Sequence, residues 1–449
     1  MASDWGSLPL LPLRCVLENL NTKDALAAMS TCRHWRSAMH LYEGHKDALK
    51  LRVKQMDKNI LLTRLFKRHI KKLHIYVNSN KEDLDYFMNH ILLQYLDTHK
   101  LHELIFIGPT YLLQNKQAPI VRLNRVLTES LMLKHADCLH RLMMLGCELS
   151  PLRNEVDTYS LKLVEQYGKP LHFTPVAPPA DAYAYRSNIV ISNFTALHFL
   201  TVDYELISNV NMATLTQLRL SQMTLNVGLR RVHRLPRVCW PRDLRVAVNV
   251  INVPQRKMHD VMHSILTEEL YLVSLKVMFC KTLYAPMINH VVRHYKATLQ
   301  ELVWVDSPYE ADPSGHIDPD DLPETEFDTT NVNPLILLCW QCIHLRRLVL
   351  HGYWIWQYEL VGLVRLRKSL ESLEVSAVYE RSESFGGAMM RVHAHDRPRP
   401  LHETHLQQVN DYTGFLWRPC PWDELHPGLR AGCTPAQRAC YVLRECAVR

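Results

Sequence analysis

A short leucine pattern recurs along the chain and constrains the fold more than any other feature of the sequence. It reads Leu-x-x-Leu-x-Leu, with other large apolar residues at some positions. Its last two apolar residues are two apart, so in a strand they point to the same side. Full copies begin at Ile70, Leu101, Leu197, Leu215, Leu299, Leu345 and Leu370, and partial copies begin at Leu139, Leu244 and Leu272. One such strand cannot bury its own apolar side, so the copies are expected to stack.

The spacing of these copies resembles that of a leucine-rich repeat. Most of the later copies follow one another by 25 to 31 residues, close to the roughly 20–29 residues typical of that repeat. The resemblance implies an α/β fold: an irregular, horseshoe-shaped solenoid with parallel strands on its concave face. Apolar spacing predicts helices between the strands at 60–66, 84–96, 121–133 and 258–266. The same pattern is also found in ordinary α/β domains, which remain the alternative.

Three intervals between copies are irregular. The copies at Leu197 and Leu215 lie 18 residues apart, too few for a strand and its return element, so one lacks a helix or is a false match. A second interval contains a loop rich in Pro and Ala at 167–187. The third contains residues 306–334, with nine acids, five prolines and no Lys or Arg. The whole chain has a formal net charge of +7, and these nine acids contribute −9, so the residues outside 306–334 carry about +16. The chain is therefore a basic body with one acidic loop.

The first 36 residues predict three short helices. An i, i+3, i+4, i+7 apolar spacing marks the first one, at Leu13, Val16, Leu17 and Leu20. Pro12 suits a helix's first turn, where a missing N–H costs nothing, and we expect it to delay the start of the helix by a residue or two. Asn21 and Thr22 can cap the second helix, and Ser30 or Thr31 can cap the third. So small a unit buries too little apolar surface to be stable alone.

These residues resemble the F-box family in order and in spacing. The family has a Leu-Pro start, an Ile/Val-Leu pair, a Leu, an Asp and a closing Cys-basic-x-Trp-Arg. The matching residues are Leu8-Pro9, Leu13, Val16-Leu17, Leu20, Asp24, Cys32-Arg33 and Trp35-Arg36. Leu11 and Pro12 stand where members often have Glu and Leu. An incidental helical hairpin inside an all-helical fold is the alternative.

The F-box resemblance implies docking onto the Skp adaptor of an SCF (Skp–cullin–F-box) ubiquitin ligase. The residues assigned to the adaptor interface are Leu8, Pro9, Leu13, Val16, Leu17, Leu20, Cys32 and Trp35. Some of these must form the small core of the F-box itself. The sequence alone does not separate the two sets.

The sequence contains no recognisable catalytic or metal-binding constellation. Cys339 and Cys342 form a Cys-x-x-Cys pair, but zinc needs a second pair of ligands, so a buried helix face is the favoured interpretation. No phosphate-binding loop and no nucleophile elbow is present. We therefore expect a protein that is not an enzyme, with no catalytic residue, cofactor or metal.

Composition favours a protein of the cytoplasm or nucleus that does not enter a membrane. The twelve cysteines are scattered rather than arranged as a disulfide framework, which favours reduced thiols. No apolar run approaches the roughly 18 residues of a membrane span. The expected domains are an F-box at 1–45, the solenoid at 46–380 with the acidic insertion 306–334, and a linker with a C-terminal cap at 381–449.

Within the last segment, Gly and Pro residues predict a linker at 379–400, followed by a helix at 401–412 that ends before Gly414. Trp417 and Trp422 are expected to cap the end of the solenoid.

An F-box followed by repeats resembles the substrate receptors of SCF ubiquitin ligases, in particular the F-box-only proteins with degenerate repeats. The resemblance implies that the F-box binds the Skp adaptor and, through it, cullin and RING subunits. The repeats would hold an unknown protein substrate close to the ubiquitin-charged enzyme, so the mechanism is proximity. Four aromatic residues are candidates for exposed substrate contacts, with a core position as the alternative: Trp304, Tyr353, Trp354 and Trp356.

Two other functions remain open at this point. One is a scaffold that uses the F-box and repeats but recruits no cullin. The other is a basic repeat protein that binds nucleic acid, for which the basic run between Arg64 and Lys72 is the candidate. The solvated face of a helix is the favoured interpretation of that run, so nucleic acid is not expected.

Overall fold

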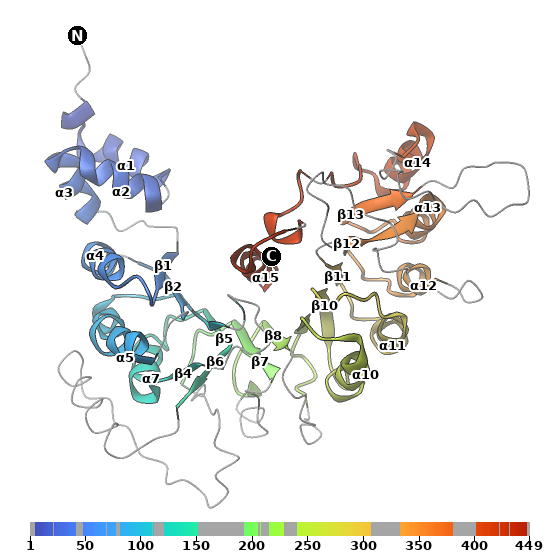
Figure 1. Cartoon of the computed structure of the whole chain (residues 1–449), viewed down its shortest axis with the longest axis horizontal. Helices are drawn as coiled ribbons and strands as arrows, with labels where there is room; N and C mark the ends of the chain where they lie inside the picture. The colour runs from blue at the N-terminus through green and yellow to red at the C-terminus, as the bar shows by residue number, and fades with distance from the viewer. Residues whose placement is uncertain are drawn as a thin grey trace, which may run out of the picture. The chain divides into compact units, whose positions relative to one another are not determined.

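The chain forms two compact units in the computed structural model. Figure 1 shows their helices and strands. The first comprises Met1–Val202 and Leu206–Leu220, and the second comprises Asp203–Glu205 and Ser221–Arg449. The structure describes residues 5–20, 22–41, 48–68, 70–77, 81–109, 111, 121–150, 193–204, 207, 215–228, 240–306, 333–379, 401–421, 423–430 and 432–446. Our predictions for 167–187, for 307–332, for 380–400 and for Trp422 lie outside these residues.

The first unit begins with the three predicted helices. They are α1 (Leu10–Glu18), α2 (Thr22–Thr31) and α3 (Arg33–Leu41), preceded by the short 3-10 helix η1 (Trp5–Ser7). Pro12 does not delay α1, because the helix starts at Leu10 with Pro9 as its N-cap. Pro12 thus lies within the first turn, where backbone N–H groups have no partner in the helix.

The rest of the first unit alternates strands with helices. Its parallel strands follow the order β1 (Leu49–Arg52), β2 (Lys72–Tyr76), β3 (Glu103–Ile107), β5 (Arg141–Leu145) and β7 (Phe199–Asp203). The helices are α4 (Met56–Phe66), α5 (Lys81–His90), the 3-10 helix η2 (Leu92–Asp97) and α7 (Arg125–Lys134). A separate parallel pair is formed by β4 (Val121–Leu123) and β6 (Cys147–Leu149).

The second unit repeats the alternation with longer strands. Its parallel strands follow the order β8 (Gln222–Val227), β9 (Val246–Ile251), β10 (Leu272–Met278), β11 (Glu301–Val305), β12 (Arg347–Trp356) and β13 (Ser372–Tyr379). The helices are α10 (Gln255–Ser264), α11 (Ala285–Tyr295), α12 (Pro334–Gln341), α13 (Gln357–Leu366), α14 (Glu403–Thr413), the 3-10 helix η5 (Pro427–Leu429) and α15 (Pro435–Cys446). Helices α10 to α13 lie along one side of these strands (Figure 1).

The leucine pattern determines the register of the parallel strands. Its middle residues are direct partners across the first unit: Leu73, Leu104, Leu142 and Leu200. The same holds in the second unit for Leu275, Leu302, Leu348 and Leu373. All eight side chains are buried. The α/β class and the parallel strands are therefore confirmed.

The structure decides between the alternatives left open for the short interval, and it corrects the centre of one copy of the pattern. The copy at Leu215 is a false match, because Leu215–Leu220 forms no strand and the strand that follows, β8, starts two residues later. Within β8, Leu225 is the partner of Val248, which in turn pairs with Leu275. The copy at Leu244 is therefore centred on Val248, which gives steps of 23 and 27 residues between these partners. Burial of Leu225 and Val248 decides this register.

Strands β1, β4 and β6 were also not predicted. Strand β1 has only Leu49 and Leu51 on its buried side, too few for a recognisable copy of the pattern. Strand β4 takes the first three residues of the segment 121–133, which was predicted to be helical throughout, and α7 takes the rest. No helix in the described part of the chain is long and apolar enough to cross a membrane.

The chain after α14 covers the outer edge of β13. The side chain of Trp417 is buried, and its Nε1 donates a hydrogen bond to the Leu373 carbonyl at 2.8 Å. The backbone N–H of Cys420 donates to the Val375 carbonyl, also at 2.8 Å. An edge strand presents backbone groups that would otherwise need water or another strand, so these contacts protect the edge.

The residues on either side of 307–332 are held by hydrogen bonds. The backbone N–H of Asp306 donates to the His351 carbonyl at 2.9 Å. On the other side, Asn333 is the N-cap of α12 and its Nδ2 donates to Glu359 Oε1 at 2.7 Å.

Strand β12 requires a glycine next to Asp306. Gly352 has a φ of +81°, and a Cβ atom there would lie 2.5 Å from the Asp306 carbonyl oxygen. The pairing of β12 with β13 shifts register at this point, between Leu350 and Trp354. The close approach of two backbones therefore depends on the absence of a side chain at 352.

We predict that Gly352→Ala lowers the free energy of unfolding by about 2–4 kcal/mol, because a left-handed φ and a steric overlap both act against the side chain. Denaturant unfolding followed by circular dichroism measures the change. Gly414→Ala is the matched control, since Gly414 has a φ of +73° but nothing within 4 Å of the added Cβ. The control should cost only about 1–2 kcal/mol. Equal losses in the two variants would contradict the steric argument.

Candidate functional site

The eight residues assigned to an adaptor interface fall into two groups, those that are buried among the N-terminal helices and those that remain accessible. Leu13 and Leu17 are buried, together with four residues of α2 and α3: Ala25, Met29, Ala38 and Met39. Pro9 is exposed. The other five are half-buried: Leu8, Val16, Leu20, Cys32 and Trp35. Leu13 and Leu17 therefore form the core of the three helices, and the remaining six are accessible at least in part.

Helix α3 holds the segment that carries Leu8 and Pro9. Trp35 Nε1 donates a hydrogen bond to the Trp5 carbonyl at 2.9 Å, and His34 Nε2 donates to the Leu8 carbonyl at 2.7 Å. Both acceptors are backbone atoms. The ring of Trp35 thus serves to position the Leu-Pro segment as well as to offer contact area.

The third helix is capped by an unexpected residue. The backbone N–H of Trp35 lies 3.5 Å from Cys32 Sγ, which accepts its hydrogen bond. Ser30 and Thr31, predicted as caps, instead donate to the carbonyls of Ala27 and Ala28. Cys32 is therefore a structural cap of α3, a role that hydroxyl or carboxamide side chains usually perform.

Three exposed apolar residues surround the Leu-Pro segment and were not assigned to it from the sequence. Trp5, Leu10 and Leu11 have exposed fractions of 65%, 51% and 75%. Leu10 and Leu11 lie away from the buried side of α1, and Trp5 belongs to η1. Apolar residues on the polar side of a helix were the sequence signal that could have revealed Leu10 and Leu11. A cluster of exposed apolar side chains on so small a unit is typical of a docking surface.

The second unit carries a set of polar side chains on the side of its strands that faces away from α10 to α13. We call this set the polar face; its members are Asn226, Asn249, Ser274, Lys276, Glu301, Arg347, His351, Ser372 and Glu374. Each one is an odd number of residues, one or three, from a buried middle residue of the leucine pattern. Strand alternation therefore directs it to the opposite side of the sheet.

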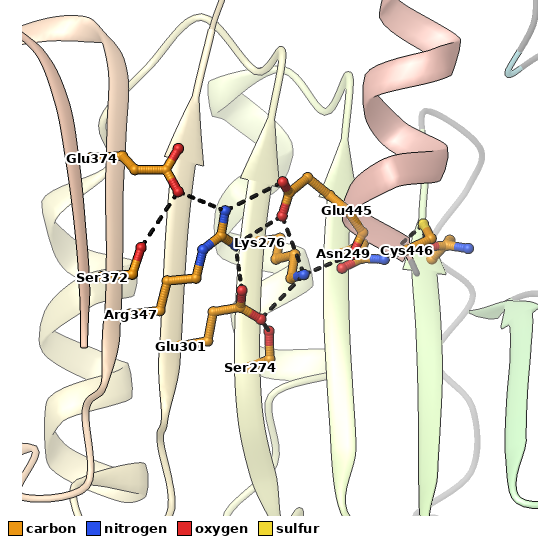
Figure 2. Close-up of polar contacts among 10 residues, drawn as sticks. Asn249, Ser274, Lys276, Glu301, Arg347, Ser372, Glu374, Glu445 and Cys446 are labelled. Atoms are coloured by element: carbon orange, nitrogen blue, oxygen red, sulfur yellow. Dashed lines mark hydrogen bonds and ion pairs between the residues drawn. The ribbon is translucent and has the colours of Figure 1, made fainter. Parts of the chain in front are cut away.

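Helix α15 lies on the polar face and inserts Glu445 among its charges (Figure 2). The carboxylate of Glu445 accepts hydrogen bonds from Arg347 at 2.9 and 3.3 Å and from Lys276 Nζ at 3.3 Å. Lys276 Nζ also lies 3.1 Å from Glu301, which pairs with Arg347 as well. Arg347 completes the network with Glu374 at 3.3 Å. The side chain of Glu445 is only 1% exposed.

The acids of this network are held in the charged form. Burial alone would raise the pKa of Glu445, but the hydrogen bond from Arg347 and the charges of Lys276 and Arg347 lower it below its ordinary value. The balance is the same for Glu301, where Lys276, Ser274 and Arg347 outweigh burial and lower the pKa. Interaction with His351, together with Arg347, lowers the pKa of Glu374 to about 2 although burial opposes it.

Cys446 extends the contact of α15 toward strands β8 and β9. Asn249 Nδ2 lies 3.2 Å from Cys446 Sγ and donates to it, and the thiol lies 3.7 Å from Asn226 Oδ1 (Figure 2). Burial raises the pKa of the Cys446 thiol to about 12. The thiol is therefore an uncharged packing group rather than a nucleophile.

The four aromatic residues proposed as substrate contacts do not form one surface. The expected exposure is wrong for Trp304 and Tyr353, which are 0% and 1% exposed. Trp304 occupies the last apolar position of its leucine pattern, which points into the core, and its Nε1 donates to the Thr282 carbonyl. Trp356 is half-buried and stacks on Tyr358. The side chain of Trp354 lies outside the described residues, and the substrate role itself stays a prediction.

The remaining candidates for chemistry are core residues. Cys339 and Cys342 are both fully buried, and burial raises the pKa of each thiol to about 12. The pair therefore belongs to the apolar side of α12 and its C-cap. Within the described residues, no group of three His, Cys, Asp or Glu side chains is arranged to hold a metal ion.

Comparison with known proteins identifies the N-terminal helices. Residues 5–43 match the F-box domain family. The chain is 36% identical over 90 residues to F-box only protein 33 of Homo sapiens, and 43% identical over 58 residues to F-box only protein 33 of Mus musculus. These alignments cover 20% and 13% of this chain, and only 15% and 10% of the relatives. The predicted resemblance to the F-box family is confirmed, over the N-terminal region alone.

We predict that Leu13→Ala lowers the free energy of opening of the three N-terminal helices by about 2–4 kcal/mol, because it leaves a cavity in their small core. Leu11→Ala is the matched control, since Leu11 is 75% exposed and belongs to the same helix. It should change this free energy by less than about 0.5 kcal/mol. Native-state hydrogen exchange of residues 10–41 measures both. Similar effects of the two changes would show that the assigned core is wrong.

We predict that the second unit loses stability as the pH falls from 4.5 toward 2, the ordinary and the folded-state pKa of Glu374. A lowered folded-state pKa contributes stability above the ordinary pKa, and the contribution disappears as the acid is protonated in the folded protein. Glu374→Gln should make thermal unfolding less dependent on pH in this range. Glu371→Gln is the control, because Glu371 is 68% exposed and pairs only with the exposed Arg346 in the described structure. An unchanged pH profile for Glu374→Gln would contradict the assignment.

Proposed function

We propose that this chain, whose residues 5–43 form an F-box domain, is a substrate-recognition subunit of an SCF ubiquitin ligase. The observation that carries the proposal is the F-box match together with the accessible Leu8-Pro9 segment that α3 holds through backbone hydrogen bonds. An F-box of this kind docks on a Skp adaptor, and cullin and RING subunits join through the adaptor. On this proposal the chain acts in the cytoplasm or the nucleus.

We propose further that the alternating strands and helices after the F-box are an irregular leucine-rich-repeat solenoid that binds the substrate. Parallel register supports this, because equivalent leucines such as Leu275, Leu302 and Leu348 are direct partners. So does the recurring order of strand, helix and strand from β9 to β13. The substrate is a protein, brought to ubiquitination and proteasomal degradation.

The mechanism proposed for the chain is proximity rather than catalysis. Holding a substrate lysine close to a ubiquitin thioester raises its effective concentration, and this contribution can be large without any acid, base or nucleophile on the receptor. The thiols of Cys339, Cys342 and Cys446 fit this role, because burial raises their pKa values and keeps them protonated.

Nucleic-acid binding has less support than protein recruitment. In the basic run at the end of α4 and the start of β2, Arg64, Arg68, Lys71 and Lys72 are exposed and Lys67 is half-buried. Its one aromatic residue, Phe66, is buried and cannot stack on a base. A solvated surface is the simpler interpretation of this run.

We predict that the double change Leu8→Ala and Pro9→Ala abolishes co-purification with the Skp adaptor, because it removes the apolar side chains of the accessible segment. The matched control is Trp340→Ala with Ile343→Ala, which removes two apolar side chains that are 61% and 59% exposed in the second unit. The control should retain the adaptor, and circular dichroism should show both variants folded. Adaptor binding that survives the Leu8 and Pro9 changes would refute the assignment.

A cullin pull-down on the unaltered chain separates the two remaining roles. Recovery of cullin with the adaptor supports a ligase receptor. Recovery of the adaptor without cullin supports a scaffold and contradicts the proposed function.

A further inference from the structure

The polar face is incompletely satisfied by the helix that covers it. Five buried side-chain nitrogen or oxygen atoms in the described residues have no hydrogen-bond partner within the chain. Four of them belong to the polar face: Asn226 Nδ2, Asn249 Oδ1, Arg347 Nε and His351 Nδ1. All four residues are more than nine-tenths buried. An unpaired buried donor or acceptor costs stability, so a ligand that pairs with these atoms would gain a hydrogen bond that α15 does not supply.

Helix α15 docks through its last turn, which carries the acidic residue Glu445. Lys276 Nζ donates to the backbone carbonyl of Glu445 at 2.6 Å, and so satisfies a carbonyl that the last turn leaves unpaired. An acidic side chain in the last turn is unfavourable in an isolated helix, because the negative end of the helix dipole lies there. Lys276 and Arg347 reverse this effect only while α15 is docked.

The polar face does not need Glu445 to balance its charges. Lys276 and Arg347 both contact Glu301, and Arg347 also contacts Glu374. The two cations therefore keep carboxylate partners on the sheet itself. Removal of α15 does not leave an isolated buried cation, whose cost would otherwise hold the helix in place.

We infer that the polar face is a recognition surface for a helical segment of a protein substrate whose last turn carries a single Glu or Asp, and that α15 occupies this surface in cis. The inference rests on the proposed function and specifies its substrate class. Of the unpaired atoms, Asn226 Nδ2 and Arg347 Nε are donors and Asn249 Oδ1 is an acceptor, while His351 Nδ1 donates or accepts according to the tautomer of its ring. Such a mixture suits the additional polar groups of a substrate segment. A substrate segment competes with α15 for the polar face. Because α15 is tethered, it is present at a high effective concentration, and this sets the minimum affinity that a substrate segment needs to displace it.

The same charges select a carboxylate over a phosphate. Two cations and two carboxylates on the sheet leave no surplus positive charge: Lys276, Arg347, Glu301 and Glu374. A side chain with one negative charge is accepted there, as Glu445 shows. A dianionic phosphate would bring a second charge next to Glu301 and Glu374, which repel it.

The test uses the full chain and a fluorescent peptide of residues 433–446 as the probe. Glu445→Gln weakens the docking of α15, so this variant should bind the probe roughly tenfold more tightly than the unaltered chain, and amide exchange in 435–446 should be faster. Glu424→Gln is the matched control, because Glu424 is 51% exposed and pairs with Arg418 rather than with the polar face. It should behave as the unaltered chain does.

Two altered probes test the chemistry of the surface. A peptide with Glu445→Gln, and a peptide with phosphoserine in place of Glu445, should each bind the variant chain about tenfold more weakly than the original probe. Equal binding of the Glu and Gln peptides overturns the inference, and so does tighter binding of the phosphoserine peptide. Equal probe binding by the unaltered and Glu445→Gln chains also overturns it, since α15 would then not compete.

Two further measurements keep the outcomes separate. If Glu445→Gln lowers the thermal unfolding midpoint, Cys446→Ala takes its place, because it loosens the contact with Asn226 and Asn249 without removing a charge. Adaptor co-purification is followed in the same variants. Absence of peptide competition with adaptor binding intact overturns this inference alone. Failure of the unaltered chain to bind the adaptor overturns the proposed function, and with it the substrate role given to the polar face, even where the peptide competes with α15.

Discussion

Strand alternation is the constraint on which the second unit depends. Adjacent side chains of a strand point to opposite sides, so the leucines that fix the helix-covered core also fix which residues point away from it. Leu275 and Lys276 are neighbours in the sequence, yet the leucine packs in the core and the lysine contacts Glu445. Parallel register extends this division from β9 to β13. Any sheet whose one side forms the core therefore also has an opposite side, and the residues between the leucines determine which side chains that opposite side carries.

The fold could be predicted where burial and pattern coincide. Leu302 and Leu348 lie in long apolar copies and were placed correctly, as direct partners in adjacent strands. The copy at Leu215 failed because spacing alone does not show which of two apolar runs will be buried, and β8 takes the next run instead. Strand β1 was missed because four residues carry too little periodicity to distinguish a strand.

The sites were predicted less completely, because some of their residues lie far apart in the sequence. The F-box residues lie within one short segment, so their order identified them, although only the folded helices separate the buried Leu13 from the exposed Pro9. Lys276 and Glu445 are 169 residues apart, and no local pattern joins them. Trp304 illustrates the opposite error: a large aromatic residue suggested a binding surface, but its place in the leucine pattern directed it into the core.

The hydrogen bonds beside residues 307–332 have a consequence for the tolerance of this chain to changes in length. Asp306 is fixed by the backbone of β12, and Asn333 is fixed both as a cap of α12 and by Glu359. The anchoring of both ends is therefore independent of how many residues lie between them. In general, doubling the number of residues between two fixed ends costs only about 0.6 kcal/mol in closure entropy. This position can accept insertions and deletions over evolutionary time at little expense to the repeats on either side.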